Sequence, residues 1–237
     1  MRTARLARIG RDEFVAERWD YRRGEHVSLS GATGFGKTQL IFELLARCAT
    51  PELPAVVFQQ KPKDETIERH APLLRYPTIP DWPPPFWHRH VTRPAGYILR
   101  PPFSFVPEVD DVRQYQTFRR AMLHCYRKGN HIVVGDELYN LVELGLSKTM
   151  ITMWSKARSM GTGFWGGVQK PSHVPLWCWN NCQHLFLTYE ADFRNRKRFG
   201  EFGGIDPRLI EDTVANLGQW EMFYARRRGR VAAIITP

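Results

Sequence analysis

The stretch Gly31-Ala-Thr-Gly-Phe-Gly36-Lys37-Thr38 decides which fold this chain can adopt. It satisfies the spacing G-x-x-x-x-G-K-[ST], in which glycines let a loop turn so that its backbone N–H groups point inward. A short strand is expected before it at residues 26–30, and residues 37–47 follow with helical spacing. The sequence therefore predicts a strand, a phosphate-binding loop and a helix. The loop residues expected to contact the phosphates are Gly31, Ala32, Thr33, Gly34, Phe35, Gly36, Lys37 and Thr38.

Two side chains of this loop carry specific chemistry. Lys37 is expected to reach the β- and γ-phosphates of ATP, and the Thr38 hydroxyl is expected to hold Mg²⁺. A chance match in a glycine-rich turn is the alternative. The predicted strand and helix on either side of the loop argue against it.

A second motif, Ile132-Val-Val-Gly-Asp136-Glu137, is an apolar strand that ends in two carboxylates. Asp136 is assigned to the Mg²⁺ shell, and Glu137 is assigned to polarise the water that attacks the γ-phosphate. A buried strand that ends in an acidic turn is common by itself. Together with the loop at Lys37, this motif predicts hydrolysis of ATP and not binding alone.

The other predicted elements alternate between strand and helix. Strands are expected at residues 55–59, 132–134, 164–168 and 185–188. Helices are expected at residues 109–127, 147–160 (capped by Ser147) and 207–216. A C-terminal β-hairpin with strands 220–225 and 231–235 occupies residues 218–237. This order predicts an α/β fold with a mostly parallel sheet flanked by helices.

Residues 72–107 hold ten of the seventeen prolines. Because proline disrupts regular helices, this segment is predicted to be a long surface insertion with one short strand at 97–99. Its aromatic residues between Trp82 and Trp87 are expected to pack the insertion onto its own domain, and stacking on single-stranded bases is the alternative. The whole chain, 1–237, is predicted to be a single domain with an N-terminal extension at 1–24.

The charge balance favours a polyanionic partner, because the net charge is +10 and the pI is about 9.7. Short basic groups at residues 22–23, 194–198 and 226–230 contribute, although each is also compatible with a solvated turn. No apolar run approaches the roughly 20 residues needed to cross a bilayer. The sequence therefore predicts no membrane insertion and a cytoplasmic location.

The four cysteines predict a reduced chain, because they are too few and too scattered for a disulfide scaffold. Cys178 and Cys182, with His173 and His184 nearby, suggest zinc as an alternative. Their spacing is not that of a usual zinc knuckle, so ordinary apolar thiols are the preferred interpretation.

A third motif runs from Arg158-Ser-Met-Gly161 through an apolar segment to Gln169-Lys170-Pro171-Ser172. This order of arginine, glycine three residues later, apolar strand, glutamine, basic residue and proline resembles the HerA and FtsK superfamily of DNA-pumping ATPases. The resemblance implies a RecA-like core with an additional strand and a catalytic glutamate. It covers roughly residues 24–225.

The resemblance also implies roles for two side chains. Gln169 would sense the γ-phosphate from the tip of the strand beside the acidic pair. Arg158 would reach the nucleotide of a neighbouring subunit and stabilise charge on the transferring phosphoryl group. A sheet-end amide and a helix-end cation are the alternatives for the two residues, and Arg194, Arg196 and Arg198 compete with Arg158 for its role.

A weaker resemblance lies in the loop that follows the strand at 55–59. The superfamily often has an aspartate and a lysine there, whereas this chain has glutamines followed by Lys61 and Lys63. Lys61, Lys63 and Lys148 are the residues proposed to contact DNA. The nucleotide of a neighbouring subunit is an alternative for Lys61 and Lys63, and solvated loops are the other alternative.

The function implied is an ATP-driven translocase of double-stranded DNA, most similar to the short packaging ATPases of viruses and phages. It would form a homo-oligomeric ring of five or six subunits, with a capsid or portal protein as a further partner, in the host cytoplasm or on a virion. Neither a membrane anchor, a winged-helix module nor a nuclease domain is expected in this chain. The alternatives are a morphogenesis ATPase resembling the zonula occludens toxin family, and a nucleotide-switched module that binds a protein through residues 72–107.

Overall fold

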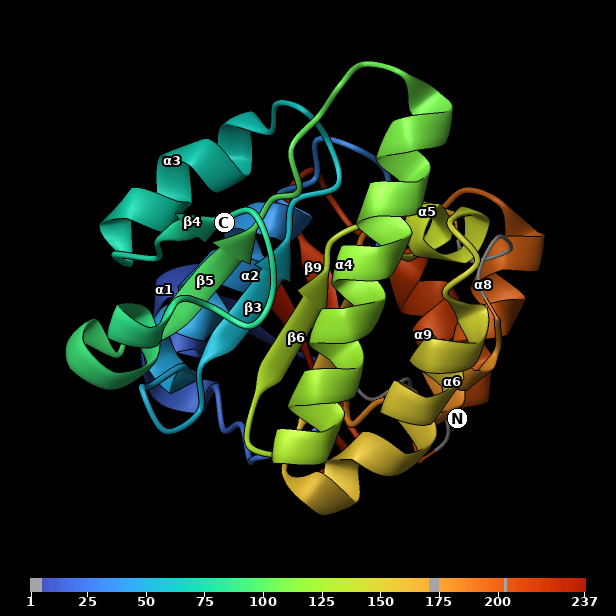
Figure 1. Ribbon diagram of the computed structural model, residues 1–237. Helices are drawn as coiled ribbons and strands as arrows, with labels where there is room; N and C mark the ends of the chain where they lie inside the picture. Colours follow the sequence, from blue (N-terminus) through green and yellow to red (C-terminus); the bar gives the residue numbers. More distant parts are fainter. Residues whose placement is uncertain (1–5, 171–174, 203) are drawn as a thin grey trace.

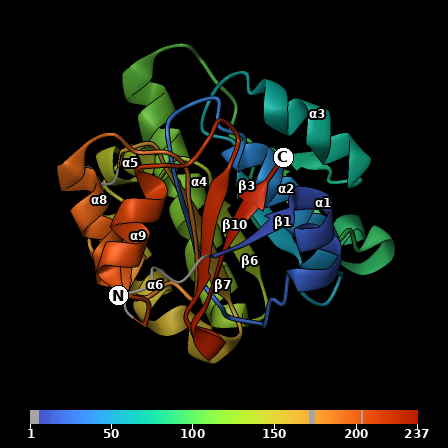
Figure 2. The ribbon, with the colours of Figure 1, turned by 180° about the vertical axis from the view of Figure 1, so that it is seen from behind.

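The predicted strands meet in one mixed sheet, which Figures 1 and 2 show from opposite sides. The computed structural model describes residues 6–170, 175–202 and 204–237. Within those ranges the sheet has ten strands in the order β1-β10-β9-β8-β2-β7-β6-β3-β5-β4. The strands are β1 (Ala7–Gly10), β2 (Val27–Ser30), β3 (Ala55–Phe58), β4 (Thr78–Ile79), β5 (Gly96–Leu99), β6 (Ile132–Gly135), β7 (Gly163–Val168), β8 (His184–Leu187), β9 (Met222–Arg226) and β10 (Val231–Thr236).

Helices cover both faces of this sheet. They are α1 (Arg11–Glu13), α2 (Lys37–Cys48), α3 (Glu65–Leu73), α4 (Pro107–Lys128), α5 (Leu138–Glu143), α6 (Ser147–Lys156), α7 (Trp177–Asn180), α8 (Phe193–Phe199) and α9 (Pro207–Val214). Short π-helical turns, η1 (Phe14–Arg18) and η2 (His88–Thr92), and 3-10 turns, η3 (Ala157–Met160), η5 (Gly200–Phe202) and η6 (Arg228–Arg230), complete the described elements. Figure 1 shows α4 and α6 in front of the sheet, and Figure 2 shows α1 and α2 on the opposite face.

Alternation along each strand divides the core between these faces, as expected for a sheet buried on both sides. On β3, Val56 and Phe58 belong to the cluster packed under α4, α6 and α9, whereas Ala55 and Val57 belong to the cluster packed under α2 and α3. The seven strands from β8 to β4 are mutually parallel, and β9 is antiparallel to β8 and β10. The predicted mostly parallel α/β sheet and C-terminal hairpin are confirmed.

Strand β7 lies between the strand that leads into the phosphate loop and the strand that ends in the acidic pair. It pairs in parallel with β2 on one side and with β6 on the other. Because all three strands run in the same direction, the loop after Ser30, the pair after Gly135 and the residues after Val168 meet at one edge of the sheet. This is the additional-strand arrangement predicted from the resemblance, and it assembles the site.

The N-terminal segment and the proline-rich segment each add a strand to the sheet that the sequence did not predict. Strand β1 of the N-terminal segment pairs in parallel with β10, with Ala7 opposite Ala233. The proline-rich segment supplies β4 as well as β5, and the Trp82 side chain, only 2% exposed, lies in the core. Describing residues 72–107 as a surface insertion was therefore incomplete, although Phe86 and Trp87 are exposed.

Three predicted boundaries need correction. Helix α4 begins at Pro107, because proline is favoured in the first helical turn. Ser147 does not cap α6: Leu146 occupies the cap position, and no side chain caps the helix. Strand β9 begins at Met222, because Trp220 adopts a left-handed backbone conformation (φ 66°) that ends extended pairing. No helix in the described ranges combines the length and apolar character needed to span a membrane.

Candidate functional site

The phosphate loop occupies the turn between β2 and α2, where glycine is required by its geometry. Gly34 and Gly36 have positive φ angles of 88° and 76°, which residues with a Cβ rarely adopt. A Cβ built on Gly31 would lie 1.9 Å from Oγ1 of Thr188 on the neighbouring strand end. The glycines therefore permit both the left-handed turns and the close approach of the loop to the sheet.

Lys37 lies under this loop and is held there by two backbone carbonyls. Its Nζ donates hydrogen bonds to Gly31 O at 2.6 Å and Ala32 O at 2.9 Å. The side chain is buried, and burial lowers the pKa of Lys37, an effect that Asp136 and Glu137 oppose. The ammonium group therefore stands within the loop, where phosphate oxygens would provide its counter-charge.

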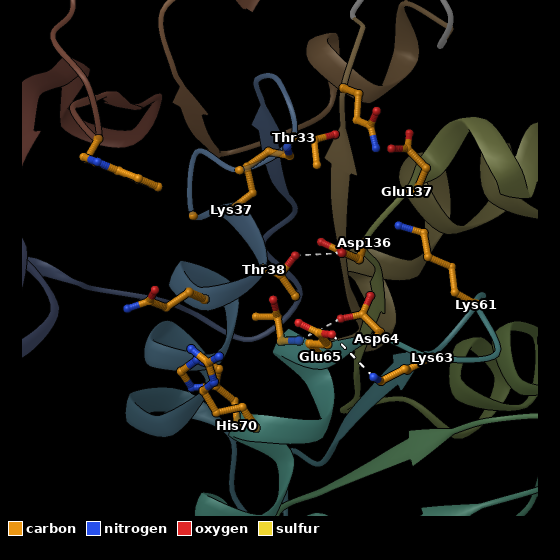
Figure 3. A pocket seen from close by; sticks show the side chains of 17 residues that line it. Thr33, Lys37, Thr38, Lys61, Lys63, Asp64, Glu65, His70, Asp136 and Glu137 are labelled. Atoms are coloured by element: carbon orange, nitrogen blue, oxygen red, sulfur yellow. Dashed lines mark hydrogen bonds and ion pairs between the residues drawn. The ribbon is translucent and has the colours of Figure 1, made fainter.

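Thr38 and Asp136, assigned together to Mg²⁺ from the sequence, are in direct contact. Thr38 Oγ1 donates a hydrogen bond of 2.8 Å to Asp136 Oδ2, drawn as a dashed line in Figure 3. Oδ1 of Asp136 is buried and has no hydrogen-bond partner among the described residues. A hydroxyl and a carboxylate with a free, buried oxygen are the hard oxygen ligands that Mg²⁺ prefers, so these residues fit the ion.

Burial also affects the two carboxylates at the end of β6. Desolvation raises the pKa of Asp136, although the hydrogen bond from Thr38 and the charge of Lys37 act against it. Desolvation likewise raises the pKa of Glu137, and the charge of Asp136 adds to this effect. A raised carboxyl pKa is suited to proton uptake from a water molecule.

Gln169 lies at the same edge, directly after β7. It lines a cavity of about 430 Å³ together with Lys37, Thr38, Asp136 and Glu137. Figure 3 shows that the side chains of Lys37, Asp136 and Glu137 face a common space. The structure therefore brings together the loop, the acidic pair and the glutamine that the sequence assigned separately.

Close packing of glycines holds Gln169 at this edge. A Cβ on Gly167 would lie 2.0 Å from the carbonyl oxygen of Asp136, and one on Gly166 would lie 2.5 Å from the Leu138 side chain. Only glycine lets β7 approach the turn at the end of β6 so closely. The spacing between Gln169 and the acidic pair is thus set by backbone contact.

Lys61 and Lys63 are exposed residues at the mouth of the cavity that contains Lys37. Both line the cavity that contains Lys37, and in Figure 3 the Lys61 amine points toward Asp136 and Glu137. Lys63 forms an ion pair of 3.4 Å with Glu65. Lys148 is exposed on the first turn of α6. Contact of these lysines with DNA stays a prediction.

Arg158 is distant from the cavity of its own chain. It lies in η3, which precedes β7, and therefore stands at the amino-terminal edge of the sheet, where Gly24 packs against its carbonyl oxygen. The competing arginines lie on α8, beyond the carboxyl end of β8. Arg196 is bound to the carbonyls of Glu190 and Ala191.

The zinc alternative finds no support in the residues that are described. His184 uses both ring nitrogens, contacting Glu25 at 2.9 Å and Tyr224 at 2.9 Å. The Cys178 and Cys182 thiols are buried, and burial raises the pKa of both. His173 lies outside the described residues, as do Pro171 and Ser172 of the third motif.

Several residues in or beside the cavity were not assigned from the sequence. The lining residues among them are Gln39, Asp64, Glu65, Thr66, Arg69, His70 and Trp220, and Arg11 lies beside the phosphate loop. The Arg11 guanidinium donates to Gly36 O at 3.3 Å and to Glu43 Oε2 at 2.6 Å. Trp220 lines the cavity on the side of α2. Neither belongs to a local motif, because Arg11 and Trp220 reach the loop only through the pairing of β1 with β10 and β10 with β9.

The sheet order and the site together define the additional-strand fold of P-loop ATPases. No protein-family model matches the sequence, and no curated protein sequence matches it. Among solved structures, the chain is similar to the genome-packaging NTPase B204 from Sulfolobus turreted icosahedral virus 2 in complex with sulfate. The TM-score is 0.62 at 13% identity, and the match covers 90% of this chain and 96% of that one.

Two more distant structures have the same fold. The conjugation coupling protein TcpA of pCW3 matches with a TM-score of 0.51 at 14% identity, over 90% of this chain and 60% of that chain. ATPases 2 and 3 of EssC from Geobacillus thermodenitrificans match with a TM-score of 0.54 at 14% identity, over 90% of this chain and 40% of that chain. These similarities establish the fold of the chain.

Proposed function

We propose that this chain hydrolyses ATP as a subunit of a ring that moves double-stranded DNA, in the manner of a packaging motor. The observation that carries the proposal is the gathering of Lys37, Thr38, Asp136, Glu137 and Gln169 around one cavity. The fold similarity to a viral genome-packaging NTPase supports it. The net charge of +10 supports a polyanionic partner.

The proposed mechanism assigns each residue a contact. The loop and Lys37 would bind the phosphates, and Thr38 and Asp136 would hold Mg²⁺, which would supply positive charge to the phosphates when bound. Glu137 takes a proton from the attacking water, for which its raised pKa suits it. The Gln169 amide binds the γ-phosphate region.

A neighbouring subunit would complete this site. Arg158 lies at the opposite edge of the sheet from the cavity of its own chain, so any contact between Arg158 and a nucleotide requires a second subunit. We propose that role for Arg158, with Arg194, Arg196 and Arg198 as the alternatives. A ring of five or six subunits provides such an interface at every site.

For DNA, we propose Lys63 and Lys148 as contacts, because both side chains are exposed. The position of Lys61 beside Asp136 and Glu137 favours a role at the phosphates instead. A grip on phosphates would be independent of base sequence. A capsid or portal protein is the further partner that this function would require.

Glu137→Gln tests the hydrolytic role. The variant is expected to keep its affinity for ATP and to lose turnover by at least about 100-fold, because an amide cannot accept the proton from water. Glu143→Gln is the matched control and should turn over normally. Glu143 is exposed at the end of α5, the helix that directly follows Glu137. Normal turnover in Glu137→Gln would contradict the assignment.

The DNA partner is tested by measuring ATPase activity with and without duplex DNA over a range of salt concentrations. Stimulation that decreases steeply with salt is expected, since each phosphate contact adds a slope of about −0.9 to log K against log [salt]. Indifference to DNA would favour the nucleotide-switched module that binds a protein.

A further inference from the structure

The cavity around the phosphate loop is also lined by residues that the proposed hydrolysis does not use. Gln39 and Trp220 are among them, and so are residues of α3, such as Thr66 and His70. We call the part of the cavity lined by Gln39 and Trp220 the Trp220 end. A nucleotide held by its phosphates in the loop needs a surface of this cavity for its base, and the Trp220 end offers an aromatic one.

Trp220 presents an exposed indole at this end. Its side chain is 45% exposed, and its ring centroid lies 6.3 Å from that of Phe35 in the phosphate loop. A Cβ built on Gly36 would lie 4.0 Å from the Trp220 ring. The indole thus stands directly beside the loop that is expected to hold the phosphates.

The backbone at Trp220 is strained, because a bulky residue with φ of 66° is a conformational outlier. Such outliers persist only where surrounding contacts impose them, and they concentrate at functional sites. Here Gly218 N donates to Glu221 Oε2 at 2.8 Å, Glu221 N donates to Gly218 O at 3.2 Å, and Arg8 forms an ion pair with Glu221. These contacts hold the backbone of the turn that carries Trp220.

Hydrogen bonds also hold the first turn of α2 next to the indole. Arg11 connects Gly36 O to Glu43, and Gln39 donates to the other carboxylate oxygen of Glu43 at 2.8 Å. These contacts order the first turn of α2 below the indole. A base stacked on this indole would need no hydrogen-bond partner for that contact.

We propose that Trp220 is the stacking surface for the base of the bound nucleotide. The inference rests on the proposed function, since it requires a nucleotide in the phosphate loop. Stacking on an indole is tolerant of base identity, because every base has a π-face. Trp220 therefore contributes the same factor to ATP and GTP affinity and does not choose between them.

The test compares two probes, ATPγS and inorganic tripolyphosphate, the second of which has no base. Binding to the full chain is measured by calorimetry with Mg²⁺ present. Trp220→Ala is expected to raise the Kd for ATPγS by roughly 5- to 150-fold and to leave the Kd for tripolyphosphate unchanged. Trp220→Phe should keep part of the ATPγS affinity, because it retains an aromatic face.

A spectroscopic readout separates stacking from a structural role. Trp fluorescence of the wild type should change on binding ATPγS but not tripolyphosphate, and Trp220→Phe should abolish that change while still binding. Trp87→Ala is the matched control, because Trp87 is 58% exposed and does not line the cavity. It should bind both probes like the wild type.

Two outcomes would overturn the inference: equal losses for both probes in Trp220→Ala, which would make Trp220 a support of the loop, or no loss for either. Failure of the proposed function looks different. In that case the wild type would bind neither probe, or Lys37→Ala would bind both as tightly as the wild type does.

Discussion

At the scale of single residues, the site contains a buried oxygen that has no hydrogen-bond partner within the described ranges. Oδ1 of Asp136 is buried and accepts no hydrogen bond from the described residues. An ionised carboxylate in such a place is costly unless a cation compensates it. Lys37 is near, but two carbonyls already hold its ammonium group. The site therefore favours a divalent ion together with the anion that accompanies it.

Asp136→Asn tests this at pH 7. Because burial raises the pKa of Asp136, the folded state binds its proton more strongly than the unfolded state does. Asp136 therefore adds to the free energy of unfolding below its unfolded pKa, and this contribution is lost as the pH rises through its folded pKa. Asn keeps an acceptor for Thr38 and removes the charge, so the variant should have a higher melting temperature without ligands.

The melting temperature of the same variant should rise less than that of the wild type when Mg²⁺ and ATPγS are added, because a ligand that binds more weakly stabilises the folded state less. Thermal unfolding followed by circular dichroism, with and without ligands, gives both values. A lower melting temperature for the unliganded Asn variant would show that the buried charge is not a burden on the fold.

At the scale of elements, β7 sets the distance between the phosphate loop and the acidic pair. It separates the strand of the phosphate loop from the strand of the acidic pair, and its glycines allow contact with the turn at Asp136. A strand with larger residues at these positions would push Gln169 away from Glu137. The absence of side chains at these glycines therefore sets the distance between Gln169 and Glu137.

Gly167→Ala is expected to lower the free energy of unfolding by at least about 3 kcal/mol, because its Cβ would lie 2.0 Å from backbone and cannot be accommodated by a rotamer change. Gly10→Ala is the control, since nothing lies within 4 Å of its added Cβ. That change should stay within about 0.5 kcal/mol. Similar denaturation midpoints for the two variants in urea would contradict this explanation of β7.

At the scale of the whole molecule, three buried histidines, His26, His131 and His184, lie at the amino-terminal ends of strands in the sheet. His26 Nδ1 accepts a hydrogen bond from Phe164 N, and His184 lies between Glu25 and Tyr224. Burial lowers the pKa of His26 to about 3 and of His131 to about 4, and it also lowers the pKa of His184. His26 and His131 are therefore uncharged in the folded protein at neutral pH.

Acid should therefore lower the free energy of unfolding already at pH values well above the pKa of a carboxyl group. The unfolded state binds protons at about pH 6.5, so each buried histidine removes up to about 1.4 kcal/mol per pH unit as the pH falls below that value. His26→Asn retains an acceptor for Phe164 N and no longer titrates. Its free energy of unfolding should depend less steeply on pH between 6.5 and 4, and an unchanged slope would refute this role for His26.

The sequence was sufficient for the parts of the site that lie in contiguous motifs. The loop at Lys37, the acidic pair at Asp136 and Glu137, and the strand that ends at Gln169 are each encoded within a few residues. The strands were recognised because buried parallel strands have apolar runs of typical length. Since parallel strands place their carboxyl ends at one edge, the meeting of these motifs could also be expected.

Only the tertiary structure decided which distant segments complete the sheet and the cavity. Ala7 and Ala233 are paired partners, although almost the whole chain separates them, and no local pattern marks such a pairing. Trp82 is buried and Trp220 stands at the cavity because of what packs around each, not because of their neighbours in sequence. The motifs determine the chemistry within a few residues, whereas burial and long-range pairing depend on the whole folded chain.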